Sequence, residues 1–515
     1  MPSWALFNGL LAEKNEPENL IRIRASNARW QRGVRLAARR RRDANMEQQI
    51  CPKRARSRGG AVLFVRATSG KRPGGAKMLF QIRTKRTPLS RSNPPFPNTN
   101  TPLPFPPKIL HIPHMPNTSH RVSRFSESTI RRMTRVANAC GAINLSQGFP
   151  DFDPPPELLA ELRNVATRGP HQYAITWGAP KFREALARKQ SHFMGLPLDP
   201  DQNFVVTCGS TEAMMAAVMT ACNPGDKVIV FTPFYENYVA DMILSGAEPI
   251  YVPLRPPDFT FDPADLERAF AQKPKALILC NPANPSGKVF TRAELERIAR
   301  LATAHDAFVI TDEVYEHLVY APHRHTYMAS LPGMFERTIS CSSLSKTYSI
   351  TGWRLGYVIA APAVIDGIRK VHDFLTVGAA APLQEAAIVA LNFPDTYYTD
   401  LLQTYTAKRD LFLAGLDAAG LAYSRPEGAY YVMVDISEFN APDDVAFCEW
   451  LARDVGVAAV PGSSFFREPV RHLIRFHFAK QEPTLHEAIR RLANLRPAAA
   501  SSSELRSAAV ATNRS

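Results

Sequence analysis

Hydrophobic and polar positions follow a regular rhythm from about residue 120 onward. Short apolar runs rich in valine and isoleucine predict buried strands of a mostly parallel sheet. The seven predicted strands are 204–207, 227–232, 249–254, 276–280, 308–311, 338–342 and 355–360. The stretches between them have helical spacing, at 211–222, 234–245, 262–271 and 292–305. Strands that alternate with helices predict an α/β fold with helices on both faces of the sheet.

Capping residues mark two of the helix starts. Asp262 precedes Pro263, and Thr291 is followed three residues later by Glu294. A side-chain oxygen at the first position accepts a backbone N–H of the first turn, and a glutamate three residues on completes a capping box. These residues predict helix N-termini at 262 and 291.

The pattern of apolar and polar positions changes after Pro362. It predicts a second, smaller α+β domain joined by long helices. The predicted elements are helices at 363–393 and 395–419, strands at 429–436 and 473–478, and a helix near 443–455. Gly420 suits the C-cap of the second long helix. The predicted division is a leader at 1–118, an N-terminal arm and part of the small domain at 119–165, the large domain at 166–370, the linking helices and small C-terminal domain at 371–497, and a disordered Ala/Ser-rich tail at 498–515.

The positive charge of the chain is concentrated in its first 120 residues. The whole chain carries a net charge of +15. Residues 1–120 hold 23 basic and 5 acidic residues, which leaves 39 basic and 42 acidic residues for the rest. The remainder is close to neutral, which argues against nucleic acid as a partner of the folded part. The leader has an arginine tract at 39–42, a proline-rich stretch at 93–116 and no sustained hydrophobic period, so we expect disorder there.

Three interpretations of the leader are open. An arginine-rich N-terminus is typical of an organelle transit peptide, although Glu13, Glu16 and Glu18 lie where such peptides avoid acidic residues. A nucleic-acid-binding or membrane-binding arm would be expected to carry regularly spaced aromatic residues, which the leader lacks. In the third interpretation, translation starts at Met115 or another internal methionine. The expected compartment is the cytoplasm, or a mitochondrion or plastid if the leader is a transit peptide.

Composition excludes some classes of protein. No apolar run is long enough to span a bilayer, so we expect no membrane partner. The seven cysteines are scattered and form no CxxC pair, which disfavours a disulfide framework and a cysteine-based zinc site. We therefore expect reduced thiols and no metal.

Polar clusters follow several of the predicted strands. Ligands of open α/β sheets bind beyond the carboxyl ends of the strands. The clusters are NPANPSG at 281–287, TDEVY at 311–315, SLSK at 343–346 with Arg354 beyond it, and GSTE at 209–212. Taken singly, each is ambiguous: Gly-Ser-Thr before a helix is more often a plain cap than an anion site. The Ser-x-x-Lys sequence lacks the companion motifs of β-lactamases, and no GxGxxG, Walker A or HExxH sequence is present.

Taken together, the clusters fit pyridoxal 5'-phosphate. That cofactor needs an amine for a Schiff base, a carboxylate facing its pyridine nitrogen and partners for its phosphate. A lysine, a strand-end aspartate, an arginine and a helix start are predicted at one sheet edge. This combination is more specific than any of its parts.

The sequence resembles the class I/II, fold-type I pyridoxal-phosphate aminotransferases. The resemblance covers about residues 121–497 and is carried by motifs in a fixed order: SQGFPDF at 146–152, Gln172-Tyr173, NPANPSG, TDEVY, SLSKTYSITGWRLGY and Arg475-Phe476. It looks closest to the kynurenine/glutamine (glutamine transaminase K) and methionine aminotransferase branch, on the QGFPDF, PGMFERT and RFHF stretches. The implied fold is a large domain with a mostly parallel seven-stranded sheet between helices, plus a smaller α+β domain.

The resemblance implies a role for each residue of the clusters. Lys346 would hold the cofactor by a Schiff base and move the proton at the substrate Cα. Asp312 would pair with the protonated pyridine nitrogen, and Tyr315 and Asn284 with the ring oxygen. The phosphate would be held by Gly209, Ser210, Thr211, Ser343 and Arg354. Phe234 would stack on the ring, although ordinary core packing explains it equally well.

Two further regions are assigned by the same resemblance. Arg475 would bind the substrate α-carboxylate, with help from Asn284 and the Gly148 backbone, and so orient the Cα–H bond for proton loss rather than decarboxylation. Tyr173 would reach the phosphate of a neighbouring subunit, which implies a homodimer.

The expected activity is transfer of an amino group from an L-amino acid to a 2-oxo acid. The stretch 375–382 carries no charge, which points away from dicarboxylates and towards aromatic or sulfur side chains, as in methionine, glutamine, phenylalanine or kynurenine. The kynurenine branch often has bulkier aromatic residues there. Two alternatives remain: a cysteine-conjugate or cystathionine β-lyase on the same scaffold, and a degenerate domain that only binds a ligand.

Overall fold

The computed structural model describes residues 10–15, 20–25, 64–69, 78–83, 117–125 and 127–495. The chain divides into two units, Met1–Pro113 and His114–Ser515, and each is described by itself. In the first unit, β1 (Leu10–Asn15) pairs antiparallel with β2 (Leu20–Ala25), and β3 (Phe64–Ser69) with β4 (Met78–Arg83). The sequence did not lead us to expect these strands. Apart from residues 117 and 118, the rest of the predicted leader and the 498–515 tail lie outside the described residues, so their disorder stays a prediction.

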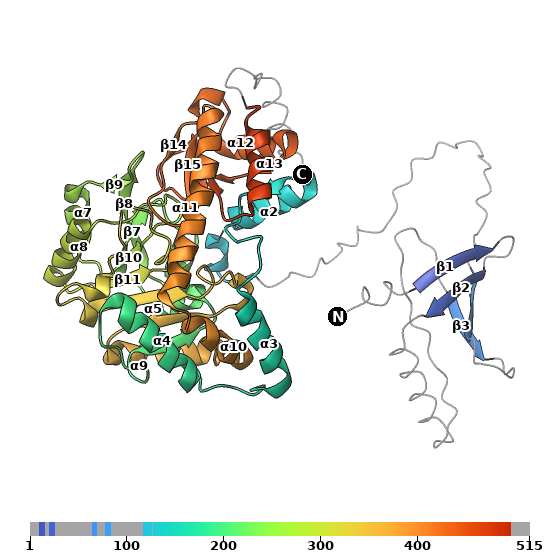
Figure 1. The fold of residues 1–515 in the computed structure, drawn as a ribbon, viewed down its shortest axis with the longest axis horizontal. Coiled ribbons are helices and arrows are strands. Elements are labelled where there is room, and N and C mark those ends of the chain that lie inside the picture. The colour runs from blue at the N-terminus through green and yellow to red at the C-terminus, as the bar shows by residue number, and fades with distance from the viewer. Residues whose placement is uncertain are drawn as a thin grey trace, which may run out of the picture. The chain divides into compact units, whose positions relative to one another are not determined.

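An eight-stranded sheet is the centre of the second unit (Figure 1). Its order is β6-β13-β12-β11-β10-β7-β8-β9. The strands are β6 (Phe204–Thr207), β7 (Lys227–Thr232), β8 (Glu248–Arg255), β9 (Thr260–Phe261), β10 (Ala276–Cys280), β11 (Phe308–Asp312), β12 (Thr338–Ser343) and β13 (Gly356–Ile359). Strands β12, β11, β10, β7 and β8 are mutually parallel, while β13 and the two-residue edge strand β9 run antiparallel to their neighbours. All seven predicted strands are present, and β9 adds an eighth.

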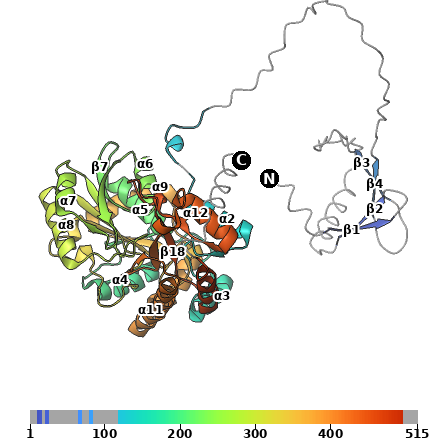
Figure 2. The same cartoon turned by 90° about the horizontal axis from the view of Figure 1, so that it is seen from above.

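Helices cover both faces of this sheet because successive strand residues point to opposite sides. On β7, Val228 and Val230 share a core with the helices α5 and α9, whereas Ile229 and Phe231 share one with α7 and α8. Figure 2 shows α7 and α8 together at one flank. At the β6 end, α4 packs with α10, which in turn contacts α3. These helices are α3 (Pro156–Arg168), α4 (Pro180–Met194), α5 (Ser210–Ala221), α6 (Asn237–Ser245), α7 (Pro263–Phe270), α8 (Arg292–Ala304), α9 (Pro362–Thr376) and α10 (Ala381–Leu391).

Both predicted caps are confirmed. The Asp262 carboxylate accepts the Ala264 N–H at the start of α7. At the start of α8, the Thr291 hydroxyl accepts the Glu294 N–H, and the Glu294 carboxylate accepts the Thr291 N–H. Each exchange satisfies helix N–H groups that have no partner within the helix.

The predicted single helix at 363–393 is wrong, because the chain breaks between α9 and α10. Val377 has a φ of 66° and Gly378 a φ of 155°, so both lie outside the helical range. Pro382 lies in the first turn of α10, where its missing N–H costs no helical hydrogen bond. Gly378 and Pro382 were the signals of this break in the sequence.

A four-stranded antiparallel sheet forms the second layer of the unit, in the order β14-β15-β18-β17. A short parallel pair, β5 with β16, joins residues near the start of the unit to residues near its end. The remaining strands are β5 (Ile143–Asn144), β14 (Tyr423–Ser424), β15 (Tyr431–Asp435), β16 (Val457–Ala458), β17 (Val460–Pro461) and β18 (Leu473–His477). The remaining helices are α2 (Thr129–Cys140), α11 (Asp395–Ala418), α12 (Asp444–Trp450) and α13 (Glu482–Leu492).

The core of this second layer draws on both ends of the unit. Met133 of α2 is buried with Phe412 of α11, Phe447 of α12 and Leu485 of α13. Of the helices in the described part of the chain, none is both long enough and apolar enough to cross a bilayer.

Candidate active site

The polar clusters lie at one edge of the large sheet. Asp312 ends β11, Ser343 ends β12, and the 281–287 loop follows β10. These three strands are parallel neighbours, so their carboxyl ends meet at the same edge. Strand β6, which has the same direction, delivers the chain to the start of α5 at Ser210. The fold therefore brings together Ser210 and Ser343, which are 133 residues apart in the sequence.

Lys346 lies in this site with its amine turned toward the N-terminal segment of the unit. Its Nζ donates to the carbonyl oxygen of Gly148 at 3.1 Å and lies 5.8 Å from the centre of the Tyr430 ring. Burial, with Arg354 nearby, lowers the pKa of the amine to about 8, against a smaller opposing effect of Asp312. Such an amine exchanges its proton near neutral pH, as a nucleophile or a general base must.

Asp312 presents a buried carboxylate oxygen that has no partner. Its Oδ2 accepts the Tyr238 hydroxyl at 2.7 Å, while Oδ1 makes no hydrogen bond. Burial raises the pKa of this carboxyl, although the Tyr238 hydroxyl and the nearby Val314 amide act to lower it. A buried carboxylate of this kind is stabilised by a cationic N–H group facing it, such as a protonated pyridine nitrogen. The residue therefore fits its predicted role.

Arg354 and the start of α5 form a cradle suited to an anion. A Cβ atom at Gly209 would lie 2.1 Å from an Nη of Arg354, so only glycine allows the guanidinium to come this close. Gly209 itself has a φ of 85°, and Arg354 is held by the carbonyls of Thr351 at 3.0 Å and Cys208 at 3.4 Å. The free N–H groups of a helix start and a guanidinium together favour a phosphate.

Arg475 is a fully buried cation with one nitrogen atom that has no partner. Its two Nη atoms donate to the Asn284 side chain and to the Ser146 carbonyl, each at 2.7 Å. Its Nε has no partner, and its guanidinium lies 4.3 Å from the Tyr431 ring centre. A buried guanidinium that is not neutralised by an acidic side chain suits a carboxylate ligand.

Tyr315 belongs to a group of buried tyrosines at the site. Its hydroxyl lies 2.8 Å from that of Tyr431, and burial raises its pKa well above the usual value. Tyr430 donates to the same Gly148 carbonyl that accepts from Lys346, at 3.0 Å. At Gly148, a Cβ would lie 2.2 Å from the Tyr431 hydroxyl oxygen, so the close approach needs glycine.

Sequence reasoning missed several residues of this site, among them Tyr238, Tyr430, Tyr431 and Ser146. Tyr238 lies four residues after Phe234, and the two other tyrosines lie in the predicted strand 429–436. Their residue type carried no signal because buried tyrosines are common in cores. Only the hydrogen bonds they make distinguish them.

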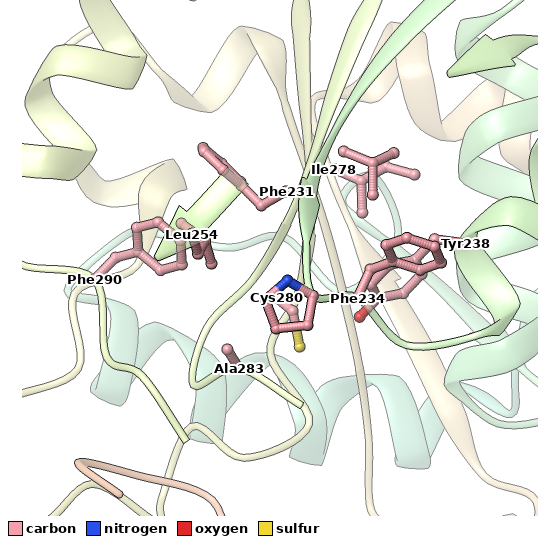
Figure 3. A pocket seen from close by; sticks show the side chains of 10 residues that line it. Phe231, Phe234, Tyr238, Leu254, Ile278, Cys280, Ala283 and Phe290 are labelled. Atoms are coloured by element: carbon pink, nitrogen blue, oxygen red, sulfur yellow. The ribbon is translucent and has the colours of Figure 1, made fainter. Parts of the chain in front are cut away.

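Phe234 lines a small apolar pocket next to the site. Figure 3 shows Phe234 and Tyr238 on one side of Cys280, with Phe231, Leu254 and Phe290 on the other. Phe234 stacks on Tyr251, with ring centres 5.8 Å apart, and its N–H donates to the Phe465 carbonyl. The predicted helix at 234–245 begins three residues late, at Asn237, which leaves Phe234 in the loop that reaches the small sheet.

The other predicted residues have varied surroundings. The Ser343 hydroxyl accepts the Ser345 N–H at 3.3 Å, and Ser210 and Thr211 form the first turn of α5. Tyr173 is 88% exposed. Within the described ranges, no cluster of three or more His, Cys, Asp or Glu side chains could hold a metal ion.

Known proteins similar to this chain are aminotransferases. Residues 141–492 match the family described as aminotransferase class I and II. A probable N-succinyldiaminopimelate aminotransferase of Mycobacterium tuberculosis is 38% identical over 74% of this chain and 100% of the relative. The Escherichia coli methionine aminotransferase is 38% identical over 73% of this chain and 97% of the relative. Human kynurenine–oxoglutarate transaminase 1 is 35% identical over 68% of this chain and 92% of the relative.

Solved structures agree with these relatives. An Escherichia coli protein with a methionine aminotransferase function superposes with a TM-score of 0.72 at 37% identity, over 74% of this chain and 100% of its own. The N-succinyldiaminopimelate aminotransferase of Mycobacterium tuberculosis gives a TM-score of 0.71 at 38% identity, over 73% and 99%. The relatives described here are all named for amino-group transfer and none for a lyase, so the lyase alternative has no support.

Proposed function

Because the chain belongs to the class I and II aminotransferases and is an enzyme of the transaminase class, we propose that it uses pyridoxal 5'-phosphate at the site around Lys346. We assign it the transfer of an amino group from an aromatic or sulfur-containing L-amino acid to a 2-oxo acid. The observation that carries the cofactor assignment is the Oδ1 of Asp312, a buried carboxylate oxygen without a partner at the carboxyl end of β11. A protonated pyridine nitrogen is the partner it lacks.

Three parts of the chain would bind different parts of the cofactor. The Arg354 guanidinium and the first N–H groups of α5, at Ser210 and Thr211, take the phosphate. Asp312 takes the ring nitrogen, and Lys346 supplies the amine for the covalent link. When bound, pyridoxal phosphate supplies an electron sink for the negative charge left at the Cα atom of the amino acid.

We assign the proton transfer at the substrate Cα to Lys346. With its pKa near 8, the amine is available in both protonation states near neutral pH, so its Nζ can take the Cα proton and return one. Arg475 holds the α-carboxylate through its free Nε and the remaining hydrogens of its Nη atoms, with Asn284 fixing the guanidinium from the side. A fixed carboxylate keeps the Cα–H bond, rather than the Cα–carboxylate bond, in line for cleavage.

The relatives are named for different amino acids at nearly equal identity, so they do not select one substrate class. The proposed class rests instead on the charge of the residues expected near the substrate side chain. The stretch 375–382 carries no cation to bind a side-chain carboxylate. Leu375 and Val377 are 44% and 49% exposed on this chain, so they line a substrate pocket only if a second copy is placed over them. An apolar pocket formed in that way accepts several uncharged side chains.

A homodimer is part of the proposal. The largest exposed apolar side chains of the described region include Phe374 at 94%, Leu375, Val377, Ile175 and Tyr173. Thr176 lies against Gly378 and against His372, so the 173–176 and 374–378 segments are neighbours on the surface. A group of exposed apolar side chains of this size favours a partner, and a second copy would bring Tyr173 to the neighbouring phosphate. We name this group the apolar patch.

An absorption spectrum of the purified full-length chain tests the cofactor and the half-reaction. A yellow protein whose visible absorption band disappears when methionine is added without an oxo acid supports both assignments. Glutamine, phenylalanine, kynurenine and aspartate then rank the donors, and aspartate as the best donor would contradict the proposed substrate class. Pyruvate and ammonia released from a cysteine conjugate would instead identify the lyase reaction. A protein that binds no added pyridoxal phosphate contradicts the proposal.

The division into an arm at 119–165, a large domain at 166–370 and a small domain at 371–497 remains part of this proposal, as does the cytoplasm or an organelle as the compartment. The hydrophobic cluster around α11, α12 and α13 shares no residue with the one around α5 and α9, which supports the division; the cluster around α7 and α8 also includes Met433 of β15 and Leu473 of β18, so the two sheets are in contact.

A further inference from the structure

A buried pair of opposite charges lies directly behind the proposed phosphate cradle. The Nδ1 of His372, on α9, is 2.6 Å from the Oε1 of Glu212, on the first turn of α5. Both side chains are buried, and the Thr376 hydroxyl also donates to the Oε1 of Glu212 at 2.8 Å. Neither residue belongs to the motifs that suggested the active site.

Hydrogen bonding indicates that His372 carries a proton on both nitrogens. Its Nε2 lies 2.8 Å from the carbonyl oxygen of Thr176, which can only accept. Its Nδ1 faces a carboxylate, which also accepts. An imidazole with two acceptor partners has to donate twice, and only the imidazolium does so.

The pKa shifts agree with this geometry. Burial opposes ionisation of both groups, but the His372 imidazole and the Cys208 amide together lower the pKa of the Glu212 carboxyl. In turn, Glu212 overcomes the effect of burial on His372 and raises the pKa of the imidazole. The other charged or titratable groups around the pair are Asp373 on α9 and the Cys208 thiol, itself near Arg354.

The second oxygen of Glu212 holds the turn that forms the cradle. Its Oε2 accepts the N–H of Cys208 at 2.5 Å, and Cys208 is followed by Gly209 and Ser210. The same Cys208 offers its carbonyl to Arg354. The carboxylate thus fixes the backbone that has to present N–H groups to a phosphate.

A carboxylate in this turn would repel the phosphate dianion unless its charge were cancelled. The His372 proton cancels this charge from within the protein, at 2.6 Å. The Thr176 carbonyl at the other end of the imidazole also ties the cradle to the surface segment that holds Tyr173.

We infer that His372 and Glu212 are positioning residues for the cofactor phosphate. The imidazolium neutralises the Glu212 carboxylate, and the carboxylate holds the Cys208–Ser210 turn in the shape that binds the phosphate. This inference rests on the proposed function, because the cradle has a purpose only if a phosphate binds there.

Binding of pyridoxine 5'-phosphate to the full-length chain, freed of cofactor, tests the inference. This probe keeps the phosphate and the ring but has no aldehyde, so its binding does not need the Lys346 linkage. Calorimetry at pH 7.5 compares the unchanged chain with His372→Gln, Glu212→Gln and His486→Gln. His486 is an exposed histidine on α13, and its variant serves as the matched control.

We expect His372→Gln to weaken binding about tenfold to hundredfold, since it leaves a buried carboxylate unneutralised beside the phosphate. Glu212→Gln keeps a carbonyl oxygen for the Cys208 N–H and loses the ion pair, so a loss of about tenfold is expected. The double variant should bind no worse than His372→Gln, because the two residues act as one unit. His486→Gln should leave the affinity unchanged.

The pH dependence gives a second readout. Above pH 7 the phosphate is mostly dianionic, so the affinity of the unchanged chain should fall as the pH rises through the raised pKa of His372. His372→Gln should lack this part of the fall, whereas the part caused by Lys346, which titrates near pH 8, is common to both chains and cancels in the comparison.

Arg354→Gln separates the two possible failures. If Arg354→Gln weakens binding but His372→Gln and Glu212→Gln do not, the positioning role is overturned and the cradle remains. If Arg354→Gln also has no effect, the phosphate site itself is misplaced and the proposed function fails with it. Should His372→Gln fail to fold, the Glu212→Gln affinity decides the question in the same way.

Discussion

The Nζ of Lys346 donates to the carbonyl oxygen of Gly148 at 3.1 Å, although 198 residues separate the two in the sequence. This contact joins the loop after β12 of the large sheet to the segment that follows β5. It also gives the amine an acceptor, which keeps a neutral or charged lysine oriented into the site.

Lys346→Met should abolish amino-group transfer and also stabilise the chain when cofactor is absent. Lys346 has a pKa of about 8 instead of 10.5, so the unfolded chain binds more protons than the folded one between these values. Below pH 8 the charged amine costs the folded state free energy, about 2 kcal/mol after allowance for its partial exposure. Thermal unfolding of the two cofactor-free chains measures the difference.

The stabilising effect of Lys346→Met should be full at pH 7 and should shrink as the pH rises from 8 to 10.5. An exposed lysine such as Lys181 of α4, changed to Met, is the control and should show no such dependence. A variant with normal turnover would overturn the assignment of the active site.

Asp312→Asn should weaken cofactor retention and slow the half-reaction by orders of magnitude. The amide keeps the size of the side chain but cannot face a protonated ring nitrogen with a negative charge. Dialysis followed by absorbance measures retention, and stopped-flow mixing with methionine measures the half-reaction. Tyr238→Phe, which removes only the hydrogen bond to Oδ2, should have a smaller effect in both assays. Equal effects of the two variants would contradict the role of the charge.

Arg475→Lys should raise KM for amino acids about tenfold to hundredfold, because a single ammonium cannot replace the planar guanidinium at a carboxylate. The effect should be absent for a donor amine that lacks the α-carboxylate. Steady-state kinetics with both donors provides the comparison. Asn284→Ala should show a weaker form of the same pattern, since it removes one hydrogen bond to the guanidinium. A loss shared equally by both donors would assign Arg475 to the fold instead.

Phe374→Glu should prevent dimer formation, because it places a charge on the most exposed side chain of the apolar patch. Sedimentation velocity at several protein concentrations measures the assembly. Met219→Glu, at a separate exposed apolar position on α5, is the matched control and should leave the assembly unchanged. A Phe374→Glu chain that remains dimeric would show that the patch is not the interface.

The sequence was sufficient to predict the strands whose carboxyl ends form the site. Buried parallel strands are continuous apolar runs, so β6, β7, β10, β11 and β12 were predicted within one residue at each end. Asp312 and Ser343 end two of them, and this fixed which side chains face the same edge. The two-residue strands β5, β9, β14, β16 and β17 were missed because two residues carry no periodicity.

Contacts between distant segments could not be predicted. Tyr238 and Asp312 are 74 residues apart, and Glu212 and His372 are 160 apart. Each of these side chains has an ordinary local pattern, and its role depends on a partner that only the folded chain supplies. The break in the predicted helix at 363–393 is a different case, because Gly378 and Pro382 mark it locally and the packing of Gly378 against Thr176 only adds to that signal.

The pairing of β5 with β16 has a consequence for how the chain is made. Ile143 and Asn144 find their partners only at Val457 and Ala458, more than 300 residues later in synthesis. The core around α2 therefore stays incomplete until the last part of the chain has left the ribosome, whereas the large sheet has all its strands by residue 359. A nascent chain halted after the large sheet would expose Met133 and its neighbours to chaperones and proteases.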